Sequence, residues 1–370
     1  MGELFDRWKR RALDECVPLN VTIELTLRCN LRCVHCYNFD RDEAYLPSRS
    51  PKEELSDEEI VRILDEVRAE GCLYLALSGG EALSHPSLDL FVAHAARAGM
   101  MVTVKTNGTM LDESRARRLH EMGAAAVEIS LYGATPATHD AFVKMPGAFE
   151  RTGRGVAAAT AAGLRPKLSF VLVEANAAEV PAMMALAEQL AVPYGIDPQI
   201  TARYDGTRDP LRLPLARSSL AQLYRGPLQH LVPPTIDNPT SVQCACARSV
   251  CGISAFGEVY PCIGAPVPSG NLRQRSFHEI WADSPTLQWI RQLKLRDFPS
   301  CEPCDHLAHC RRSSGVIFAN TGDYTGPPRF GDDWTCMEAE VLHELHDEHR
   351  EPTAGAAPIA GGALRRHSIE

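Results

Sequence analysis

The sequence has no excess of positive charge and no long hydrophobic run, and each absence excludes a class of protein. It carries 38 Lys and Arg against 47 Asp and Glu, a formal net charge of −9, whereas nucleic-acid binding calls for a basic face. No segment approaches the roughly 18 apolar residues of a membrane span. Residues 1–11 are charged where a signal peptide has an apolar core, and Asp6 stands where a myristoylation site would have Ser or Thr. We therefore expect a cytoplasmic protein with no nucleic-acid partner and no membrane partner.

Cysteine, in contrast, is abundant. The 370 residues are 45% hydrophobic and 23% charged, which suits a globular enzyme of two domains, and they include 13 cysteines. In a reducing cytosol clustered cysteines more often bind metals than form disulfides. Cys16 and Cys72 stand alone and are expected to be ordinary small residues. The others form three groups: Cys29, Cys33 and Cys36; Cys244, Cys246, Cys251 and Cys262; and Cys301, Cys304, Cys310 and Cys336.

The first group follows an apolar strand predicted over residues 21–27, with three and then two residues between its cysteines. Three buried thiolates cannot remain uncompensated, so they must bind a metal, form a disulfide or stay protonated. A structural zinc ion takes four ligands. Three suit a four-iron cluster in which one iron has no protein ligand, because each iron of such a cluster normally takes one cysteine. The open iron would bind a small molecule and pass it an electron.

Apolar strands and amphipathic helices alternate through the first half of the chain. The first helix begins with a capping box, Ser56 with Glu59, and ends at Gly71. Apolar runs such as residues 72–77 are typical of strands buried on both faces of a parallel sheet. The predicted strands are 21–27, 72–77, 101–105, 126–131, 167–173 and 194–201, and the later helices 87–98, 112–122, 149–162 and 177–190. This α/β order predicts a partial (β/α)6 barrel, whose chemistry gathers at the carboxyl ends of its strands.

The second half loses this rhythm. Residues 246–262 read as a small hairpin that turns at Gly257, followed by a helix that carries Trp281. The second half contains two sets of four cysteines, and a set of four cysteines suits a zinc ion and an iron–sulfur cluster alike. The predicted division is an N-terminal extension (1–18), the barrel (19–209), a proline-rich linker (210–239), a small cysteine-rich domain with little regular secondary structure (240–348) and a disordered tail (349–370).

The first cysteine group resembles that of the radical S-adenosylmethionine (SAM) enzymes, although His35 replaces the aromatic residue that usually precedes the third cysteine. The resemblance implies that the open iron chelates SAM, and that one electron cleaves SAM to a 5′-deoxyadenosyl radical. It also implies that Gly79, Gly80 and Glu81, after the second strand, meet the SAM amino group, and that Ser130 meets the ribose. The resemblance implies further SAM contacts by three residues that follow later strands, Asn107, Lys144 and Arg203. Lys144 and Arg203 are equally suited to a solvated surface.

The second half resembles the SPASM extension of such enzymes, which implies two auxiliary [4Fe–4S] clusters. Ser314 stands where the family has one more cysteine, and Cys244 is expected to substitute for it. The implied ligand sets are Cys244, Cys246, Cys251 and Cys262 for one cluster, and Cys301, Cys304, Cys310 and Cys336 for the other. Positions that match the extension are Cys246, Gly257, Cys262, Cys301, Cys304, Cys310 and Cys336.

The resemblance implies an oxidative modification, most directly of a ribosomally synthesised peptide, by a crosslink, a thioether or a similar bond. An electron donor such as flavodoxin or ferredoxin is expected. Residues 1–20 are too short for a peptide-binding domain, so either a separate peptide-recognition protein or a leader-independent substrate is expected. Ile263 follows Cys262 where sulfatase maturases have an acid. Two alternatives stay open at this point: a dehydrogenase of a small molecule, and a non-catalytic binding protein scaffolded by zinc.

Overall fold

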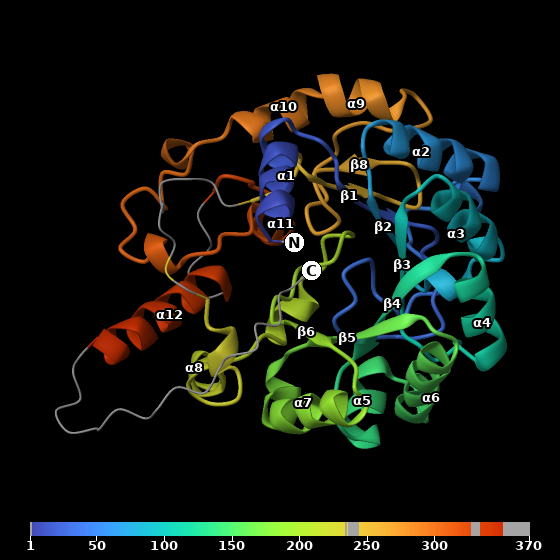
Figure 1. Cartoon of the computed structure of the whole chain (residues 1–370). Helices are drawn as coiled ribbons and strands as arrows, with labels where there is room; N and C mark the ends of the chain where they lie inside the picture. The colour runs from blue at the N-terminus through green and yellow to red at the C-terminus, as the bar shows by residue number, and fades with distance from the viewer. Residues whose placement is uncertain (1, 234, 236–243, 327–333, 351–370) are drawn as a thin grey trace.

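The computed structural model describes residues 2–233, 235, 244–326 and 334–350. Its first six strands run parallel, each pairing with the next along the chain. The predicted six-stranded α/β barrel is therefore confirmed (Figure 1). The strands are β1 (Asn20–Glu24), β2 (Tyr74–Ser78), β3 (Met101–Thr106), β4 (Ala124–Leu131), β5 (Arg165–Val171) and β6 (Tyr194–Asp197).

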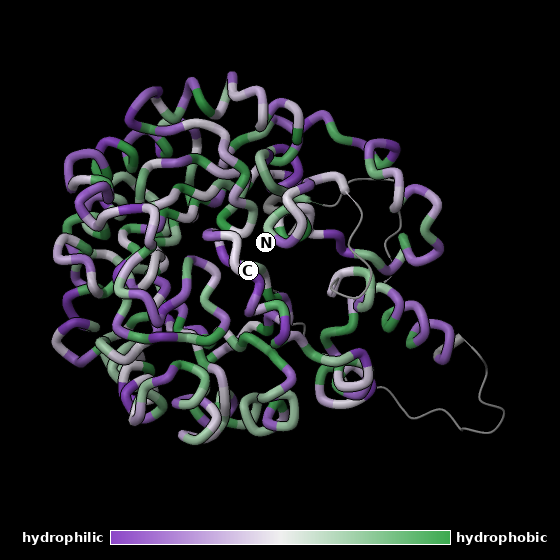
Figure 2. The backbone as a smooth tube through the Cα atoms, turned by 180° about the vertical axis from the view of Figure 1, so that it is seen from behind, coloured by the Kyte–Doolittle hydropathy of each residue, from purple (hydrophilic) through white to green (hydrophobic). Residues whose placement is uncertain are grey.

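Helices cover the outer face of these strands. Ser56 and Glu59 cap α2, the first helix after β1, through reciprocal side-chain-to-backbone hydrogen bonds, as predicted. A short additional helix, α5 (Pro136–Val143), was not predicted; Thr135 caps it and Pro136 occupies its first turn. The other helices of this half are α1 (Gly2–Asp14), α2 (Asp57–Ala69), α3 (Leu88–Arg97), α4 (Glu113–Glu121), α6 (Ala148–Ala161) and α7 (Val180–Gln189). Figure 2 shows hydrophobic residues recurring along the strands and hydrophilic ones along the outward turns of the helices.

The strands are buried on one face only, so the prediction of burial on both faces is wrong. In β4, Val127 and Ile129 are fully buried against the helices, whereas Glu128 and Ser130 alternate with them and stay partly exposed. Strands β2, β3 and β5 repeat this alternation, most clearly β2, whereas β6 contains no buried residue and β1 also buries Glu24 at its end. In an incomplete barrel the inner face is not covered by a second layer of helices, and here it is lined largely by polar side chains.

The cysteine-rich half joins the same sheet. Strands β7 (Val250–Ile253) and β8 (Val259–Tyr260) form the predicted hairpin, with Gly257 at its turn in the left-handed region (φ 81°). Strand β7 also pairs in parallel with β1, from Asn20 opposite Val250 to Ile23 opposite Ile253. The sequence did not predict this pairing, which places the hairpin against the strand that leads into the first cysteine group.

Regular structure beyond the hairpin exceeds the expectation. The helices there are α9 (Phe277–Asp283), α10 (Pro285–Gln292), α11 (Ser314–Thr321) and α12 (Trp334–Arg350). The predicted linker also contains α8 (Arg217–Arg225), which packs against α12 and buries Leu220 and Tyr224. Residues 351–370, most of the predicted tail, lie outside the described residues.

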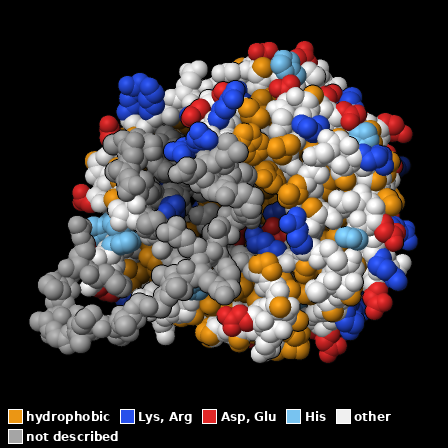
Figure 3. All heavy atoms as spheres, viewed as in Figure 1, with side chains coloured by type: hydrophobic (Ala, Val, Ile, Leu, Met, Phe, Trp, Pro, Cys, Tyr) orange, Lys and Arg blue, Asp and Glu red, His pale blue; other side chains and the backbone are white. Residues whose placement is uncertain are grey.

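None of the described helices combines the length and the apolar character needed to cross a bilayer. The face seen in Figure 3 has acidic and basic side chains interspersed along its right-hand rim, and both hydrophobic and basic side chains near its middle.

Candidate functional site

The loop that follows β1, residues 25–41, carries Cys29, Cys33 and Cys36 and is called the triad loop below. Burial, with a smaller contribution from the neighbouring charge of Cys36 and against the lowering effects of the Leu31 N–H and Arg41, raises the pKa of the Cys29 thiol to about 11. Burial raises the pKa of Cys33 as well, followed by the charges of Cys36 and Cys29. The three sulfurs thus lie close enough to repel one another as thiolates. Such a donor set fits a cationic metal cluster, because only a bound cation lets all three be thiolates at neutral pH.

Arg41 supplies a positive charge at this loop. Its Nε donates to Cys36 Sγ over 3.0 Å and its Nη1 donates to the Leu27 carbonyl over 2.7 Å. Only 7% of the residue is exposed, and its guanidinium lies 4.2 Å from the centre of the Phe39 ring. Sequence reasoning missed Arg41, whose only signal was a basic residue shortly after the last cysteine.

The two glycines after β2 pack directly against the triad loop. The Gly80 N–H donates to the Thr26 carbonyl over 2.7 Å. A Cβ on Gly79 would lie 2.3 Å from that carbonyl oxygen, and a Cβ on Gly80 only 2.5 Å from the carbonyl oxygens of Leu27 and Arg28. The structure therefore gives these glycines a packing reason, and their predicted contact with SAM stays a prediction.

Glu81 and Asn107 tie the end of β3 to the triad loop. The Glu81 carboxylate accepts hydrogen bonds from the Leu83 N–H (2.9 Å), the Thr106 hydroxyl (2.7 Å) and the Asn107 N–H (2.8 Å). Burial raises its pKa, while these donors lower it. The Asn107 side chain donates to Asn30 Oδ1 over 2.9 Å. Both residues thus support the triad loop, and neither prediction of a SAM contact is tested by these bonds.

The other predicted SAM contacts differ in exposure. Ser130 lies partly exposed on the inner face of β4. Lys144 follows α5 with a left-handed backbone (φ 54°) and forms an exposed ion pair with Asp42 at 3.1 Å, so its surface alternative is favoured. Arg203 is only 7% exposed, and its Nη1 donates to the Thr207 hydroxyl over 3.1 Å. A solvated surface role is therefore wrong for Arg203.

Glu54 is a second residue that the sequence did not reveal. Its buried carboxylate accepts hydrogen bonds from the Thr26 hydroxyl (2.8 Å), the Leu27 N–H (2.7 Å) and the Tyr45 hydroxyl (2.7 Å). Thr26 and Leu27 directly precede the triad cysteines. One carboxylate therefore fixes the path of the chain from β1 into the triad loop.

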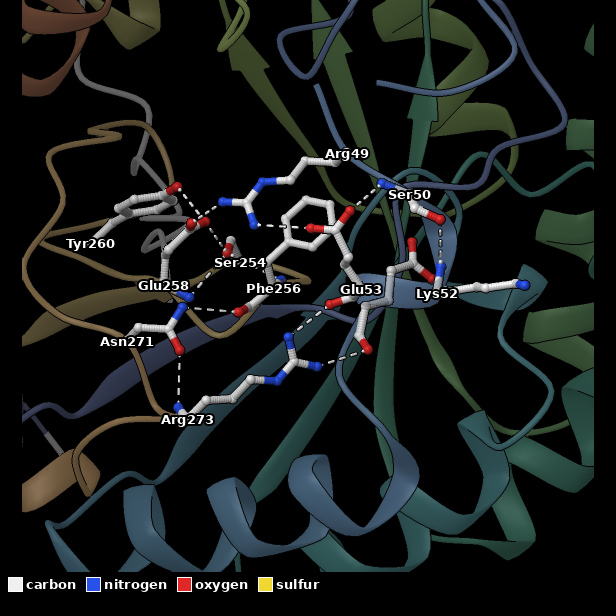
Figure 4. A network of polar contacts seen from close by, with 11 residues as sticks. Arg49, Ser50, Lys52, Glu53, Ser254, Phe256, Glu258, Tyr260, Asn271 and Arg273 are labelled. Atoms are coloured by element: carbon white, nitrogen blue, oxygen red, sulfur yellow. Dashed lines mark hydrogen bonds and ion pairs between the residues drawn. The ribbon is translucent and has the colours of Figure 1, made fainter. Parts of the chain in front are cut away.

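A polar network joins the segment that carries Glu54 to the hairpin, and Figure 4 shows Arg49 bonded to both Glu53 and Glu258. Arg273 donates to the Glu53 carbonyl over 2.9 Å and to the Glu54 carbonyl over 3.0 Å. Arg49 pairs with Glu258 of the hairpin at 2.5 Å, and its guanidinium lies 4.7 Å from the centre of the Phe256 ring. The hairpin thus supports the segment that positions the triad loop.

Among the hairpin cysteines the structure brings three together. The Cys244 and Cys246 side chains lie within hydrogen-bond reach of each other, as do those of Cys246 and Cys262. Cys251 differs, because it is fully buried in the core and its Sγ faces the carbonyls of Gly252 and Tyr260. Its assignment as a cluster ligand stays a prediction.

Two cysteines of the last group, Cys301 and Cys310, lie near Arg312. Burial, followed by the charges of Cys301 and Cys304, raises the pKa of Cys310 to about 11. Arg312 Nη1 donates to Cys301 Sγ over 3.3 Å. Helix α12, which carries Cys336, contacts the short 3-10 turn η7 (Leu307–His309) just before Cys310.

Ser314, which replaces a family cysteine, is 1% exposed, and its hydroxyl accepts from Arg312 Nε over 3.2 Å. A Cβ on the adjacent Gly315 would lie 2.6 Å from the Ala265 side chain. The chain at Gly315 therefore packs against the segment that follows Cys262. Within the described part of the chain, no three His, Cys, Asp or Glu side chains converge as they would around one ion. A cluster does not require such convergence, because each cysteine binds a different iron.

The cysteine groups coincide with two known families of domain. The radical SAM superfamily model matches residues 23–186, and the SPASM model, an iron–sulfur cluster-binding domain, matches residues 244–311. The first match contains the triad loop, and the second contains every cysteine of the second half except Cys336.

Similar proteins agree with these matches. An AdoMet-dependent heme synthase of Methanosarcina barkeri is 29% identical, over 83% of this chain and 94% of its own. The mycofactocin maturase MftC of Mycobacterium ulcerans is 29% identical, over 90% of this chain and 92% of its own. The fold resembles that of Streptococcus suis SuiB bound to its precursor peptide SuiA, with a TM-score of 0.66 and 16% identity over 89% of this chain and 78% of that one.

Proposed function

Because this chain belongs to the radical SAM superfamily and carries a SPASM domain, we propose that it cleaves SAM reductively and uses the product to oxidise a peptide. Radical SAM and SPASM domains bind [4Fe–4S] clusters. The cysteines proposed to hold the SAM-binding cluster are Cys29, Cys33 and Cys36. When bound, that cluster supplies the electron that cleaves SAM to a 5′-deoxyadenosyl radical.

The observation that carries this proposal is the triad loop itself. It presents three partly exposed, mutually repelling sulfurs at the carboxyl end of β1, where the chemistry of a β/α barrel gathers. Arg41 adds a buried cation to this set. Three cysteines leave one iron of a four-iron cluster free of protein ligands, and that iron is the proposed site for SAM.

The polar inner face of the barrel is proposed to receive the substrate. Lys105, Glu128 and Lys167 lie in one row, because their strands pair in register at these positions. Lys105 Nζ lies 3.3 Å from the Glu128 carboxylate. In the described part of the chain no ion pair involves Lys167, so its ammonium is available to a carboxylate of the substrate. Such a face suits a peptide better than an apolar ligand.

The auxiliary cysteine sets support a net oxidation. Hydrogen abstraction leaves a substrate radical, which must lose a further electron to become a closed-shell product. A cluster at Cys244, Cys246 and Cys262, in the hairpin beside β1, or at the last cysteine group would accept that electron. An electron donor such as flavodoxin or ferredoxin and a separate peptide-recognition protein remain part of the proposal.

A second candidate substrate is a small molecule that bears carboxylates. The relative named AdoMet-dependent heme synthase aligns over 94% of its own length, and another similar protein is named Fe-coproporphyrin III synthase. The lysines of the inner face would suit the carboxylates of a tetrapyrrole as well as those of a peptide.

Mass spectrometry of the products distinguishes the two candidates. The anaerobically reconstituted enzyme is given SAM and dithionite together with either a candidate precursor peptide or iron coproporphyrin. The proposal expects a peptide that has lost hydrogen, in an amount that matches the 5′-deoxyadenosine formed. Conversion of the porphyrin alone would favour the second candidate. No conversion of either, despite SAM cleavage, would leave the substrate part of the proposal without support.

A further inference from the structure

Two arginines each donate a hydrogen bond to a cysteine sulfur, in two cysteine groups far apart in the sequence. Arg41 reaches Cys36 Sγ over 3.0 Å, and Arg312 reaches Cys301 Sγ over 3.3 Å. Each guanidinium also lies over a phenylalanine ring. Arg41 lies 4.2 Å from the centre of the Phe39 ring, and Arg312 lies 4.8 Å from the centre of the Phe298 ring. The same arrangement thus occurs twice in one chain.

Neither arginine is free to swing away from its sulfur. Arg41 is 7% exposed and also donates to the Leu27 carbonyl over 2.7 Å. Arg312 donates through Nη2 to the carbonyls of Tyr324 (3.1 Å) and Gly326 (3.0 Å). Backbone carbonyls therefore fix the direction of both guanidinium groups. Arg41 is buried and Arg312 partly buried, and a fixed cation in such a place acts more strongly on its neighbours than a fully solvated one.

Ser314 orients the second of these arginines. Its hydroxyl is buried and accepts from Arg312 Nε over 3.2 Å, which leaves Nη1 of the same guanidinium for Cys301. The residue that replaces a family cysteine is thus engaged with an arginine. This contact gives the serine a role that does not require it to ligate a cluster.

We propose that Arg41 and Arg312 are positioning residues that raise the reduction potentials of the SAM-binding cluster and of the second auxiliary cluster, and that Ser314 holds Arg312 in place. The inference rests on the proposed function, because Cys36 and Cys301 must ligate these clusters. A reduced cluster carries one more negative charge than the oxidised one. A fixed N–H donor and cation at a ligating sulfur therefore stabilise the reduced form more.

Redox titrations followed by electron paramagnetic resonance test the inference. Arg312→Gln and its control Arg296→Gln, in the exposed 3-10 turn η6 (Leu295–Asp297), each remove one positive charge near the last cysteine group, and of the two only Arg312 donates to a cysteine sulfur. Both are made in the Cys29/Cys33/Cys36→Ala background, so that only auxiliary clusters contribute. We expect Arg312→Gln to shift the ratio of oxidised to reduced cluster about tenfold at a fixed potential, which is about 59 mV toward the negative. Arg296→Gln should leave that ratio unchanged.

The Arg41 and Ser314 variants complete the test. Arg41→Gln, made in the enzyme with all its cysteines, should lower the reduction potential of the SAM-binding cluster alone. That cluster is identified as the signal that the Cys29/Cys33/Cys36→Ala substitution removes. Ser314→Ala should shift the second auxiliary cluster in the direction of Arg312→Gln by less, and should add nothing once Arg312 is already Gln. Lysine at either arginine position keeps the charge without the planar donors, so we expect a smaller shift in the same direction.

The outcomes separate this inference from the proposed function. A wild-type enzyme without iron would contradict the proposed function. Variants that hold as much iron as the wild type and titrate at its potentials would overturn the inference alone. Loss of iron from both the Gln and the Lys variants at one position would also overturn it, because that arginine would then serve cluster assembly.

Discussion

Glu24, the last residue of β1, gives a prediction whose size can be worked out from its surroundings. The residue is 1% exposed, and its Oε1 accepts a hydrogen bond from the Tyr37 hydroxyl over 2.8 Å. Burial raises its pKa from 4.5 to about 7, against the lowering effects of the Tyr37 bond and of Arg41. The titratable and charged groups that face it come from the triad loop, the hairpin and the segment after β6: Tyr37, Arg41, Glu258, Tyr260 and Tyr204.

The direction of the effect follows from the raised pKa. The folded protein binds the Glu24 proton more tightly than the unfolded chain does. The resulting contribution of Glu24 to the free energy of unfolding is fully present below about pH 4.5 and is lost as the pH rises through about 7. A shift of this size, at roughly 1.4 kcal/mol per pKa unit, corresponds to about 3 kcal/mol. Glu24→Gln has no charge to bury. The wild type should therefore lose about 3 kcal/mol relative to this variant between pH 4.5 and pH 8.

Anaerobic guanidinium unfolding at pH 5 and pH 8 measures this difference. The wild type is compared with Glu24→Gln and with Glu121→Gln, a substitution on the exposed surface of α4. We expect the midpoint of the Glu24 variant to gain on the wild type as the pH rises, and the control to follow the wild type. A difference between wild type and Glu24→Gln that stays constant over this range would refute the reasoning.

Two further predictions concern the support of the triad loop. Glu54→Ala leaves its three donors without an acceptor and should lower the free energy of anaerobic unfolding by about 3–5 kcal/mol. The control Glu53→Ala, at the half-exposed neighbouring residue, should lower it by at most about 1 kcal/mol. Equal losses would contradict the role given to Glu54. Gly80→Ala places a Cβ 2.5 Å from backbone carbonyl oxygens of the triad loop and should lower the iron bound there. Gly153→Ala, in open space on α6, should keep all its iron and add up to about 1 kcal/mol of stability. Full iron in Gly80→Ala would show that the loop tolerates the shift.

The order of strands and helices could be predicted because hydrophobic period, capping boxes and turn residues are local signals. The helix begun at Ser56 and the hairpin that turns at Gly257 are examples. The exposure of the inner face was missed because β2 reads as a continuous apolar run, which predicts burial on both faces. In the structure Tyr74 and Ala76 lie partly exposed on the inner face and alternate with the fully buried leucines. The helix α8 was missed because prolines flank it and it depends on packing against α12.

The candidate site was predicted where its residues are close in sequence. The spacing of the triad cysteines is a local pattern, whereas Glu54 reaches Leu27 from 27 positions along the chain. No pattern in the sequence shows that β7 pairs with β1, or that Arg312 reaches Cys301. These contacts depend on the fold, and for that reason the supporting residues around the cysteines emerged only from the structure.

The account depends on the triad cysteines holding a cluster with one iron open to SAM. The most direct test measures iron and 5′-deoxyadenosine in the reconstituted wild type and in the Cys29/Cys33/Cys36→Ala variant, with SAM and dithionite present. Counting four irons per cysteine-ligated cluster, we expect about twelve irons per chain and steady 5′-deoxyadenosine formation from the wild type, and about eight irons and none of that product from the variant. A variant that still cleaves SAM, or a wild type that holds zinc in place of iron, would contradict the central claim.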